Sequence, residues 1–374
     1  MSSCRLIRAV GVLLASSLAL PAPGAQAVTG SVKPPAGNQA ATIATLPALQ
    51  ADLQQTTVSG LSSGAFMAAQ FAVAYSATVS GAGMIAGGPF YCASQPGRFP
   101  FIAYLNNALT TCMNPAEAQV APPVASELLK AAQDFARDKL IDDTANLQRQ
   151  RIYLFSGTRD RTVTRAVVEQ VARFYQLAGT PAAQVRLVDN VAAGHAIITD
   201  SRDDAACDQT QSPFINNCGF MQSQALLQHL YPELKPPVMQ PGGKLIAFNQ
   251  RNFIRSSYSS MSNTGYVYVP DVCNRESCRV HVAFHGCLQT TQAIGMRFVT
   301  GTGYNQIADS NRIIVLYPQA EPSPIYPYNP KGCWDFWGYT SINPLAPDFY
   351  RKDGTQMAAV KAMLDRLGAR RGTR

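Results

Sequence analysis

The sequence predicts an α/β fold with one mostly parallel sheet of about eight strands and helices on both of its faces. Short apolar runs alternate with helical patterns from residue 56 to the end of the chain. Such alternation is typical of a parallel sheet that is covered on both sides. A chain of 374 residues, 47% of them hydrophobic, can bury a core of that size.

Four strands are expected in the first half of the chain, over residues 56–60, 81–87, 151–157 and 184–190. Helical patterns occupy residues 65–75 and 163–177 between them. Four more strands are expected in the second half, over residues 244–248, 265–269, 279–284 and 312–317. The stretch 290–309 separates the last two of these, and a closing helix is expected over 354–367.

Two glycine motifs indicate which α/β fold this is. The strand over 279–284 runs into His285 and Gly286, which is how α/β-hydrolases begin the loop that carries oxyanion-hole N–H groups. The pattern G-x-S-x-G occupies residues 60–64, far before that loop, whereas hydrolases normally place it after. Reading from residue 244 to the chain end and then from residue 56 restores the ordinary order. The sequence therefore predicts a circularly permuted α/β-hydrolase fold.

Ser62 is the predicted nucleophile because it lies at the centre of the G-x-S-x-G pattern. A strand precedes it and a helix follows it, as a nucleophile elbow requires. A tetrahedral oxyanion needs at least two N–H donors that are fixed in advance. The residue after the nucleophile, Ser63, is expected to supply one backbone N–H, and Cys287 in the His-Gly-Cys loop the other.

Four histidines could provide the base that a serine nucleophile needs. His195 follows the strand over 184–190 in a loop of small residues, where an imidazole could reach the elbow. His229 lies in a helical pattern and is expected at the surface or in packing, His281 lies inside a strand, and His285 belongs to the oxyanion loop. The sequence favours His195, with a loop histidine bonded to a backbone carbonyl as the alternative.

Asp160 is the predicted carboxylate partner of the base. It follows the strand over 151–157 and precedes a helix, the position where open α/β sheets carry functional groups. Asp189 also follows a strand, but hydrolase order requires the acid, then one helix and one strand, then the histidine. An N-cap of the following helix is the alternative role for Asp160.

The stretch over 332–341 contains both tryptophans of the chain, Trp334 and Trp337, beside Phe336 and Tyr339. Aromatic residues of this kind usually belong to a core. Their position in a loop after a strand would also allow an apolar acyl subsite near the serine. Both tryptophans are therefore candidate substrate-binding residues.

The N-terminus predicts export. Arg5 and Arg8 precede an apolar run over 9–20, and the small-residue pattern Ala25-Gln26-Ala27 follows. These are the features of a cleaved signal peptide, expected over residues 1–27, followed by a loose leader over 28–50. The remainder, 51–374, is expected to be a single catalytic domain without a separate substrate-binding domain, in a secreted protein that is extracellular or periplasmic.

Export would leave eight cysteines after the loss of Cys4, and an even number in an oxidising compartment predicts disulfides. The short spacings suggest the pairs Cys273–Cys278 and Cys207–Cys218.

Composition and spacing exclude several other classes. The apolar run over 9–20 is too short to span a membrane. The charge of +8 is clustered only near the C-terminus, without the basic and aromatic stripe of a nucleic-acid-binding protein. His281 and His285 lie about 13 Å apart along one strand, too far to share a metal ion. We expect a monomer with no metal and no cofactor.

Seven motifs occur in the order "GLSSGAF", "SGTRDRTV", "AAGHAI", "FINNCGF", "VAFHGCLQ", "IIVLYPQ" and "CWDFWGYT". Together they resemble the catalytic domain of polyhydroxybutyrate (PHB) depolymerases of the circularly permuted type. The resemblance implies hydrolysis of poly(3-hydroxybutyrate) or its oligomers, a polyester substrate. It also implies a triad of Ser62, Asp160 and His195, Cys287 as oxyanion donor, and a tryptophan of "CWDFW" in the monomer subsite.

Two other functions are compatible with the same sequence. One is a secreted esterase of this fold that acts on small or plant-wall esters of the feruloyl type, because a fold does not fix its substrate. The other is a non-catalytic granule-binding protein, which a complete triad disfavours.

Overall fold

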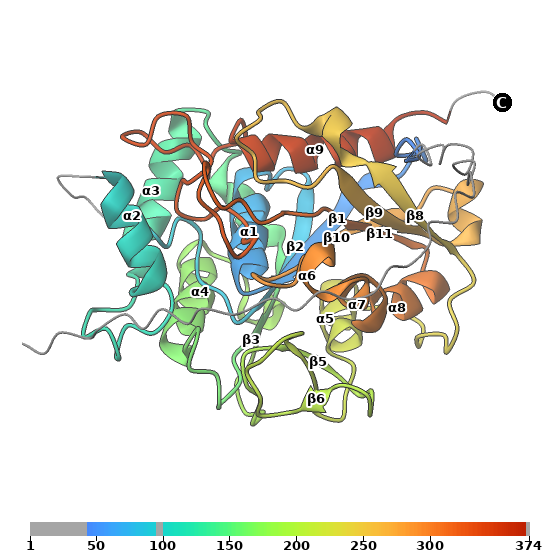
Figure 1. Ribbon diagram of the computed structural model, residues 1–374, viewed down its shortest axis with the longest axis horizontal. Coiled ribbons are helices and arrows are strands. Elements are labelled where there is room, and N and C mark those ends of the chain that lie inside the picture. Colours follow the sequence, from blue (N-terminus) through green and yellow to red (C-terminus); the bar gives the residue numbers. More distant parts are fainter. Residues whose placement is uncertain (1–42, 95–99, 372–374) are drawn as a thin grey trace, which may run out of the picture. The chain divides into compact units, whose positions relative to one another are not determined.

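The computed structural model describes residues 43–94 and 100–371, and its main sheet has eight strands (Figure 1). The order across this sheet is β4-β3-β2-β1-β10-β11-β9-β8. All neighbours are parallel except β9, which is antiparallel to both β11 and β8. The strands are β1 (Asp52–Leu61), β2 (Val79–Ile85), β3 (Arg151–Phe155), β4 (Val185–Val188), β8 (Lys244–Asn249), β9 (Thr264–Val269), β10 (Arg279–Phe284) and β11 (Ile313–Tyr317). All eight predicted strands are confirmed, and the sheet is mostly parallel as expected.

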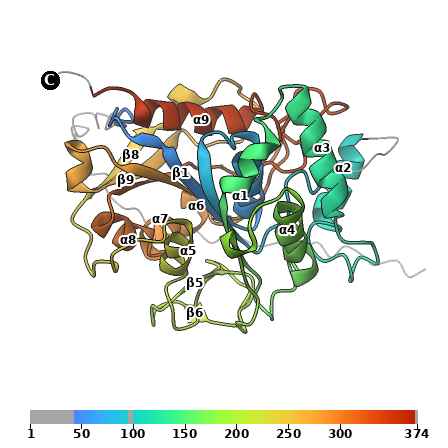
Figure 2. The ribbon, with the colours of Figure 1, turned by 180° about the vertical axis from the view of Figure 1, so that it is seen from behind.

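Helices cover both faces of this sheet. Alternate residues of a strand point to opposite faces, and Phe284 of β10 packs against Phe71 of α1 whereas His281 of β10 stacks on Tyr304 of α8. Figures 1 and 2 show α9 on one side of the strands and α5 with α8 on the other. The helices are α1 (Ser63–Ala74), α2 (Pro100–Leu109), α3 (Ala125–Arg137), α4 (Arg165–Leu177), α5 (Gln222–Leu230), α6 (Thr291–Ile294), α7 (Arg297–Gly301), α8 (Tyr304–Ser310) and α9 (Thr355–Gly368).

The strand order confirms the circular permutation. Taken as β8, β9, β10, β11, β1, β2, β3 and β4, the sheet has the strand sequence of an ordinary hydrolase. The end of α9 meets the segment that leads into β1, because Leu367 O accepts hydrogen bonds from the N–H groups of Leu49 and Ala51, both 3.0 Å long. Arg366 Nε also donates to Leu46 O at 2.9 Å. The described segments at the two ends of the chain therefore lie side by side, where an unpermuted hydrolase would have a connection.

Several elements were not assigned from the sequence. Helices α2 and α3 lie between β2 and β3, and a second sheet follows β4 with the order β5-β7-β6. Its strands are β5 (Ile197–Thr199), β6 (Ala205–Ala206) and β7 (Ile215–Asn217). The expected signal peptide over 1–27 and most of the expected leader lie outside the described residues. The described part of that leader, from residue 43, already packs on the domain, and Leu46 is fully buried.

Four disulfides cross-link the described residues, which fits a secreted protein. The predicted pairs Cys207–Cys218 and Cys273–Cys278 are both present. The other two pairs are Cys92–Cys112 and Cys287–Cys333. Within the described part of the chain, no group of three His, Cys, Asp or Glu residues could hold a metal ion. None of the helices in that part is long and apolar enough to cross a membrane.

A buried histidine links β1 to β10. His281 is fully buried, with Nδ1 2.7 Å from Thr57 Oγ1 and Nε2 2.8 Å from Ser59 Oγ. Ser59 Oγ also shares a 2.6 Å hydrogen bond with Tyr304 OH. Burial lowers the pKa of His281 to about 3, because an imidazolium would lose its hydration here. The ring is therefore neutral in the folded protein, with both nitrogens hydrogen-bonded.

This burial predicts that acid destabilises the fold. An unfolded histidine has a pKa of about 6.5, so the unfolded chain binds the His281 proton between about pH 6.5 and pH 3 while the folded chain does not. The free energy of unfolding should therefore fall as the pH is lowered through that window, by up to about 1.4 kcal/mol per pH unit from this residue. Urea titrations at several pH values between about 3 and about 6.5 give the free energy of unfolding at each pH. This free energy should change less steeply with pH for His281→Asn than for the wild-type protein. An equal dependence of the unfolding free energy on pH in the two proteins would contradict the prediction.

Candidate active site

The sharp turn between β1 and α1 carries Ser62. Its backbone has φ 56° and ψ −124°, a positive-φ conformation that a residue with a side chain rarely adopts. The turn is held from both sides, because Ser62 N–H donates to Ile85 O at 3.0 Å and Ser62 O accepts from Ala65 N–H at 2.8 Å. These are the features of a nucleophile elbow, which lifts the serine hydroxyl above the sheet.

Two glycines make the elbow possible by allowing close backbone contact. A Cβ atom on Gly60 would lie 2.8 Å from the carbonyl oxygen of Phe284 and would also collide with the backbone of Gly64. A Cβ atom on Gly64 would collide with the carbonyl oxygens of Phe284 and His285. Real Cβ contacts are not this short, so both positions need glycine. The G-x-S-x-G spacing therefore follows from the packing of the elbow against β10.

The oxyanion loop lies beside the elbow because β1 and β10 are paired in register. Gly60 is opposite Phe284, so the residues that follow each strand meet, and a Cβ on Gly286 would lie 3.4 Å from Ser62 Cβ. Ser63 and Cys287 line the same cavity as Ser62. Among residues 43–94 and 100–371, neither the Ser63 N–H nor the Cys287 N–H has a hydrogen-bond acceptor. Both donors are free to bind a ligand atom.

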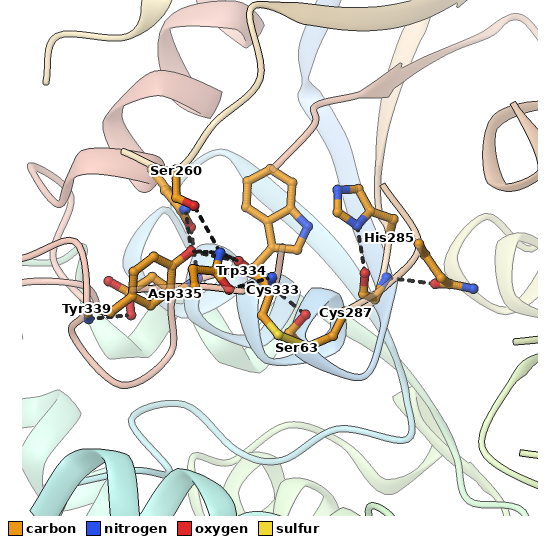
Figure 3. The surroundings of a disulfide bond; sticks show 12 residues. Ser63, Ser260, His285, Cys287, Cys333, Trp334, Asp335 and Tyr339 are labelled. Carbon is orange, nitrogen blue, oxygen red and sulfur yellow. Dashed lines mark hydrogen bonds between the residues drawn. A yellow bond between two sulfur atoms is a disulfide. The ribbon is translucent and has the colours of Figure 1, made fainter. Parts of the chain in front are cut away.

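A disulfide ties the oxyanion loop to the tryptophan-containing loop (Figure 3). Cys287 is bonded to Cys333, and the next residue, Trp334, donates its backbone N–H to Ser63 Oγ at 3.2 Å. Asp335 then shapes the rest of this loop by accepting hydrogen bonds from the N–H groups of residues 337–340. The nucleophile elbow and both neighbouring loops are thus joined to one another.

His195 and Asp160 form a buried pair. His195 Nδ1 lies 2.8 Å from Asp160 Oδ2, and the two residues are only 5% and 7% exposed. The other oxygen, Asp160 Oδ1, accepts from the N–H groups of Thr162 and Val163 at 2.8 and 3.0 Å. Asp160 therefore fixes the turn before α4 with one oxygen and orients the imidazole with the other. Thr210 Oγ1 accepts the His195 N–H at 2.9 Å and steadies the loop.

The rival residues have other partners. Asp189 Oδ2 is paired with Arg165 at 2.8 Å, and His229 Nε2 is 2.9 Å from Gln184 O. His281 is enclosed between β1 and β10, and His285 lies in the oxyanion loop. Of the four histidines, His195 lines the cavity that contains Ser62. No hydrogen bond joins Ser62 Oγ to His195 within the described part of the chain.

The cavity above Ser62 has a volume of about 380 Å³ and is mostly apolar. Trp337 and Phe336 line it, together with Leu105 and Leu109 of α2. Trp334 does not line it, because its side chain is fully buried against Phe284 and His285. A larger cavity of about 810 Å³, near Tyr91 and Tyr350, lacks a serine elbow and a histidine, so the smaller cavity is the candidate active site.

The sequence did not point to several residues that build this site. They hold the loops through side chains that the motifs left without a role: Thr210, Gln289, Cys333 and Asp335. Gln289 Oε1 accepts the Gly286 N–H at 2.7 Å, and its Nε2 donates to Pro213 O at 2.8 Å. It thereby connects the oxyanion loop to the segment that follows Thr210. The one sequence signal for this role is that Gln289 ends the motif "VAFHGCLQ".

The permuted sheet, the serine elbow, the buried histidine–carboxylate pair and the two free N–H groups define the class: a serine hydrolase of the α/β-hydrolase fold that acts on carboxylic esters. The chain is 35% identical over 339 residues to the polyhydroxybutyrate depolymerase of Talaromyces funiculosus, covering 86% of this chain and 92% of that relative. It belongs to the PHB depolymerase family.

Other comparisons agree. The chain is 42% identical over 333 residues to the poly(3-hydroxybutyrate) depolymerase of Delftia acidovorans, a match that covers 87% of this chain but only 62% of that protein. The crystal structure of PHB depolymerase from Penicillium funiculosum has a TM-score of 0.75 at 32% identity, covering 87% of this chain and all of that one. A PHB depolymerase with a serine-to-alanine change, complexed with an R3HB trimer, has a TM-score of 0.76 at the same identity and coverage. No family model matches the chain.

The disulfides should differ in their effect on stability. The pair Cys287–Cys333 closes a sequence separation of 46 residues, and Cys273–Cys278 one of only 5. Loop-closure entropy then gives stabilisation of about 4 and about 2 kcal/mol, respectively. Replacing both cysteines of a pair with serine should therefore lower the denaturation midpoint more for Cys287 and Cys333. A larger loss for Cys273 and Cys278 in guanidinium titrations would contradict this order.

Proposed function

We propose that this chain hydrolyses poly(3-hydroxybutyrate) or its oligomers through an acyl-enzyme formed on Ser62. The observation that carries the proposal is the mostly apolar cavity of about 380 Å³ in which Ser62, His195 and Cys287 meet. The names of both relatives support the polyester substrate, and one structural relative is complexed with an R3HB trimer. An apolar cavity with a few polar groups at its base suits an aliphatic ester chain.

Acyl transfer then takes two steps. His195 accepts the Ser62 proton through Nε2 as Ser62 Oγ attacks the ester carbonyl, while Asp160 accepts the Nδ1–H and keeps the imidazole in the required tautomer. The N–H groups of Ser63 and Cys287 hold the negative oxygen of the tetrahedral intermediate. His195 gives its proton to the leaving alcohol, and water, activated by the same imidazole, releases the acyl group.

Trp337 is the proposed residue of the monomer subsite. Its side chain is partly exposed and lines the cavity, and it contacts the ring of Phe336 at a centroid distance of 4.9 Å. The indole offers an apolar surface to the methyl and methylene groups of a hydroxybutyrate unit. Trp334 is proposed to stabilise the site without contacting the substrate, through its backbone hydrogen bond to Ser63.

Export and a monomeric state complete the proposal. The N-terminal pattern of basic, apolar and small residues supports export to the periplasm or the medium, and the four disulfides of the described domain favour an oxidising compartment. The monomeric state is part of the same proposal.

The direct test is release of 3-hydroxybutyrate by the purified protein from amorphous granules, crystalline polymer and soluble oligomers, with feruloyl and p-nitrophenyl esters in parallel. Ser62→Ala should lower kcat by about a millionfold. Asp160→Asn should lower it on the order of ten-thousandfold, because the imidazole takes the wrong tautomer.

The exposed Ser126 lies outside the cavity, so Ser126→Ala serves as the matched control and should retain activity. No release from any form of the polyester by a folded protein, with turnover of the small esters, would replace the proposal with a small-ester esterase. More than a few per cent of wild-type activity in Ser62→Ala would remove Ser62 from its proposed role.

Substitutions of the two tryptophans should have different effects on KM. Trp337→Ala should raise KM for a soluble trimer about tenfold or more, because the substrate loses apolar contact area. Trp334→Phe keeps the backbone hydrogen bond to Ser63 and removes an indole N–H that is buried without an acceptor in the described structure. It should leave KM within about twofold and act mainly on stability. The reverse pattern, with KM sensitive to residue 334 alone, would place the subsite elsewhere.

A further inference from the structure

His285 is a buried histidine at the edge of the site that acyl transfer leaves without a role. It directly follows β10, is fully buried, and lies beside Trp334 and Phe298 at ring-centroid distances of 5.5 and 6.2 Å. Its Nδ1 is 2.8 Å from Gly286 O, and its Nε2 is 3.1 Å from Ala320 N. Figure 3 shows its imidazole next to Cys287.

These two partners fix the protonation of the ring. The Ala320 N–H can only donate, so Nε2 must present its lone pair. Gly286 O can only accept, so Nδ1 must carry a hydrogen. Burial lowers the pKa of His285 to about 4, so the imidazole is neutral at pH 7. Only the neutral Nδ1–H tautomer satisfies both hydrogen bonds.

The hydrogen bond to Gly286 O sets the direction of the Cys287 N–H. The carbonyl of Gly286 and the N–H of Cys287 belong to one peptide group, which is not among the cis peptides of the described chain. In a trans peptide the C=O and N–H bonds point in opposite directions. With the carbonyl held toward the buried ring of His285, the Cys287 N–H points away from that ring, and Cys287 lines the cavity with Ser62.

The other contacts of the loop act on different groups, except for one longer hydrogen bond to the same carbonyl. Gln289 Oε1 holds the N–H of Gly286, and the disulfide holds the Cys287 side chain. The Gln289 N–H also reaches Gly286 O, but at 3.3 Å. The 2.8 Å contact from His285 is therefore the short hydrogen bond on this carbonyl. A hydrogen bond accepted by a carbonyl also polarises the N–H of the same peptide group and strengthens it as a donor.

We propose that His285 is a positioning residue for the oxyanion hole, whose neutral Nδ1–H tautomer orients and polarises the peptide group that presents the Cys287 N–H. The proposal deepens the proposed function and rests on it, because that function supplies the oxyanion. His285 does not touch the substrate. Its effect should appear in the chemical step rather than in substrate binding.

The kinetic test compares two variants with a control, using a soluble hydroxybutyrate trimer and p-nitrophenyl acetate. His285→Leu removes the donor to Gly286 O, whereas His285→Asn retains an N–H donor at the place of Nδ1. His229→Leu is the matched control, because it also removes an imidazole bonded to a backbone carbonyl, and His229 does not line the cavity.

His285→Leu should lower kcat on the order of 10- to 100-fold with little change in KM, because a misplaced oxyanion donor acts on the transition state. His285→Asn should recover most of that loss, and His229→Leu should keep the wild-type kcat. A folded His285→Leu with wild-type kcat, or with only a raised KM, would overturn the proposal. So would a His285→Asn variant that is as slow as His285→Leu. If the wild-type protein itself turned over neither ester, the proposed function would fail instead.

A measurement on the unmodified protein covers the case in which these variants do not fold. With ¹⁵N-labelled histidine, long-range ¹H–¹⁵N spectra at pH 7 distinguish the two neutral tautomers from the imidazolium. The ring of His285, assigned through its contact with the Ala320 amide proton, should carry its hydrogen on Nδ1. A hydrogen on Nε2, or on both nitrogens, would overturn the proposal whatever the activity.

Discussion

The parallel pairing of β1 with β10 is the constraint on which the candidate site depends. It sets Gly60 opposite Phe284, so that the elbow after one strand and the oxyanion loop after the other emerge side by side. The approach is close enough that Gly60 and Gly64 cannot carry a side chain. This pairing therefore accounts for the backbone features of the site. They are the raised position of Ser62 and two N–H groups without acceptors in the described structure. The neutral His281 of β10 joins the same two strands through its hydrogen bond to Ser59 of β1.

Because this constraint acts through strand pairing, it does not depend on the order of the strands along the chain. The permutation moves the ends of the domain to the junction of α9 and β1, where Leu49 and Ala51 still bond to Leu367 O. It separates Ser62 and the oxyanion loop in sequence while leaving them adjacent in space. The Cys287–Cys333 disulfide and the Trp334 N–H to Ser63 Oγ hydrogen bond then fasten the loops around the elbow.

The parts predictable from sequence were those with a local pattern. Strands with buried residues on both faces gave continuous apolar runs, and the strand order followed once the two glycine motifs fixed the reading direction. The pairing of His195 with Asp160 followed from that order. The small sheet β5-β7-β6 has strands of two or three residues, too short for a period. Trp334 and Trp337 share one loop, and only tertiary packing decides that the first is buried and the second lines the cavity.

The central claim is that the elbow and the His-Gly-Cys loop together bind a tetrahedral oxyanion on Ser62. A crystal structure of the protein after reaction with a p-nitrophenyl alkylphosphonate tests it most directly. We expect phosphorus bonded to Ser62 Oγ, one phosphoryl oxygen about 2.7–3.1 Å from the N atoms of both Ser63 and Cys287, and His195 Nε2 near the adduct. A phosphonate on another residue, or a phosphoryl oxygen that contacts neither N–H group, would show that these residues do not form the oxyanion site.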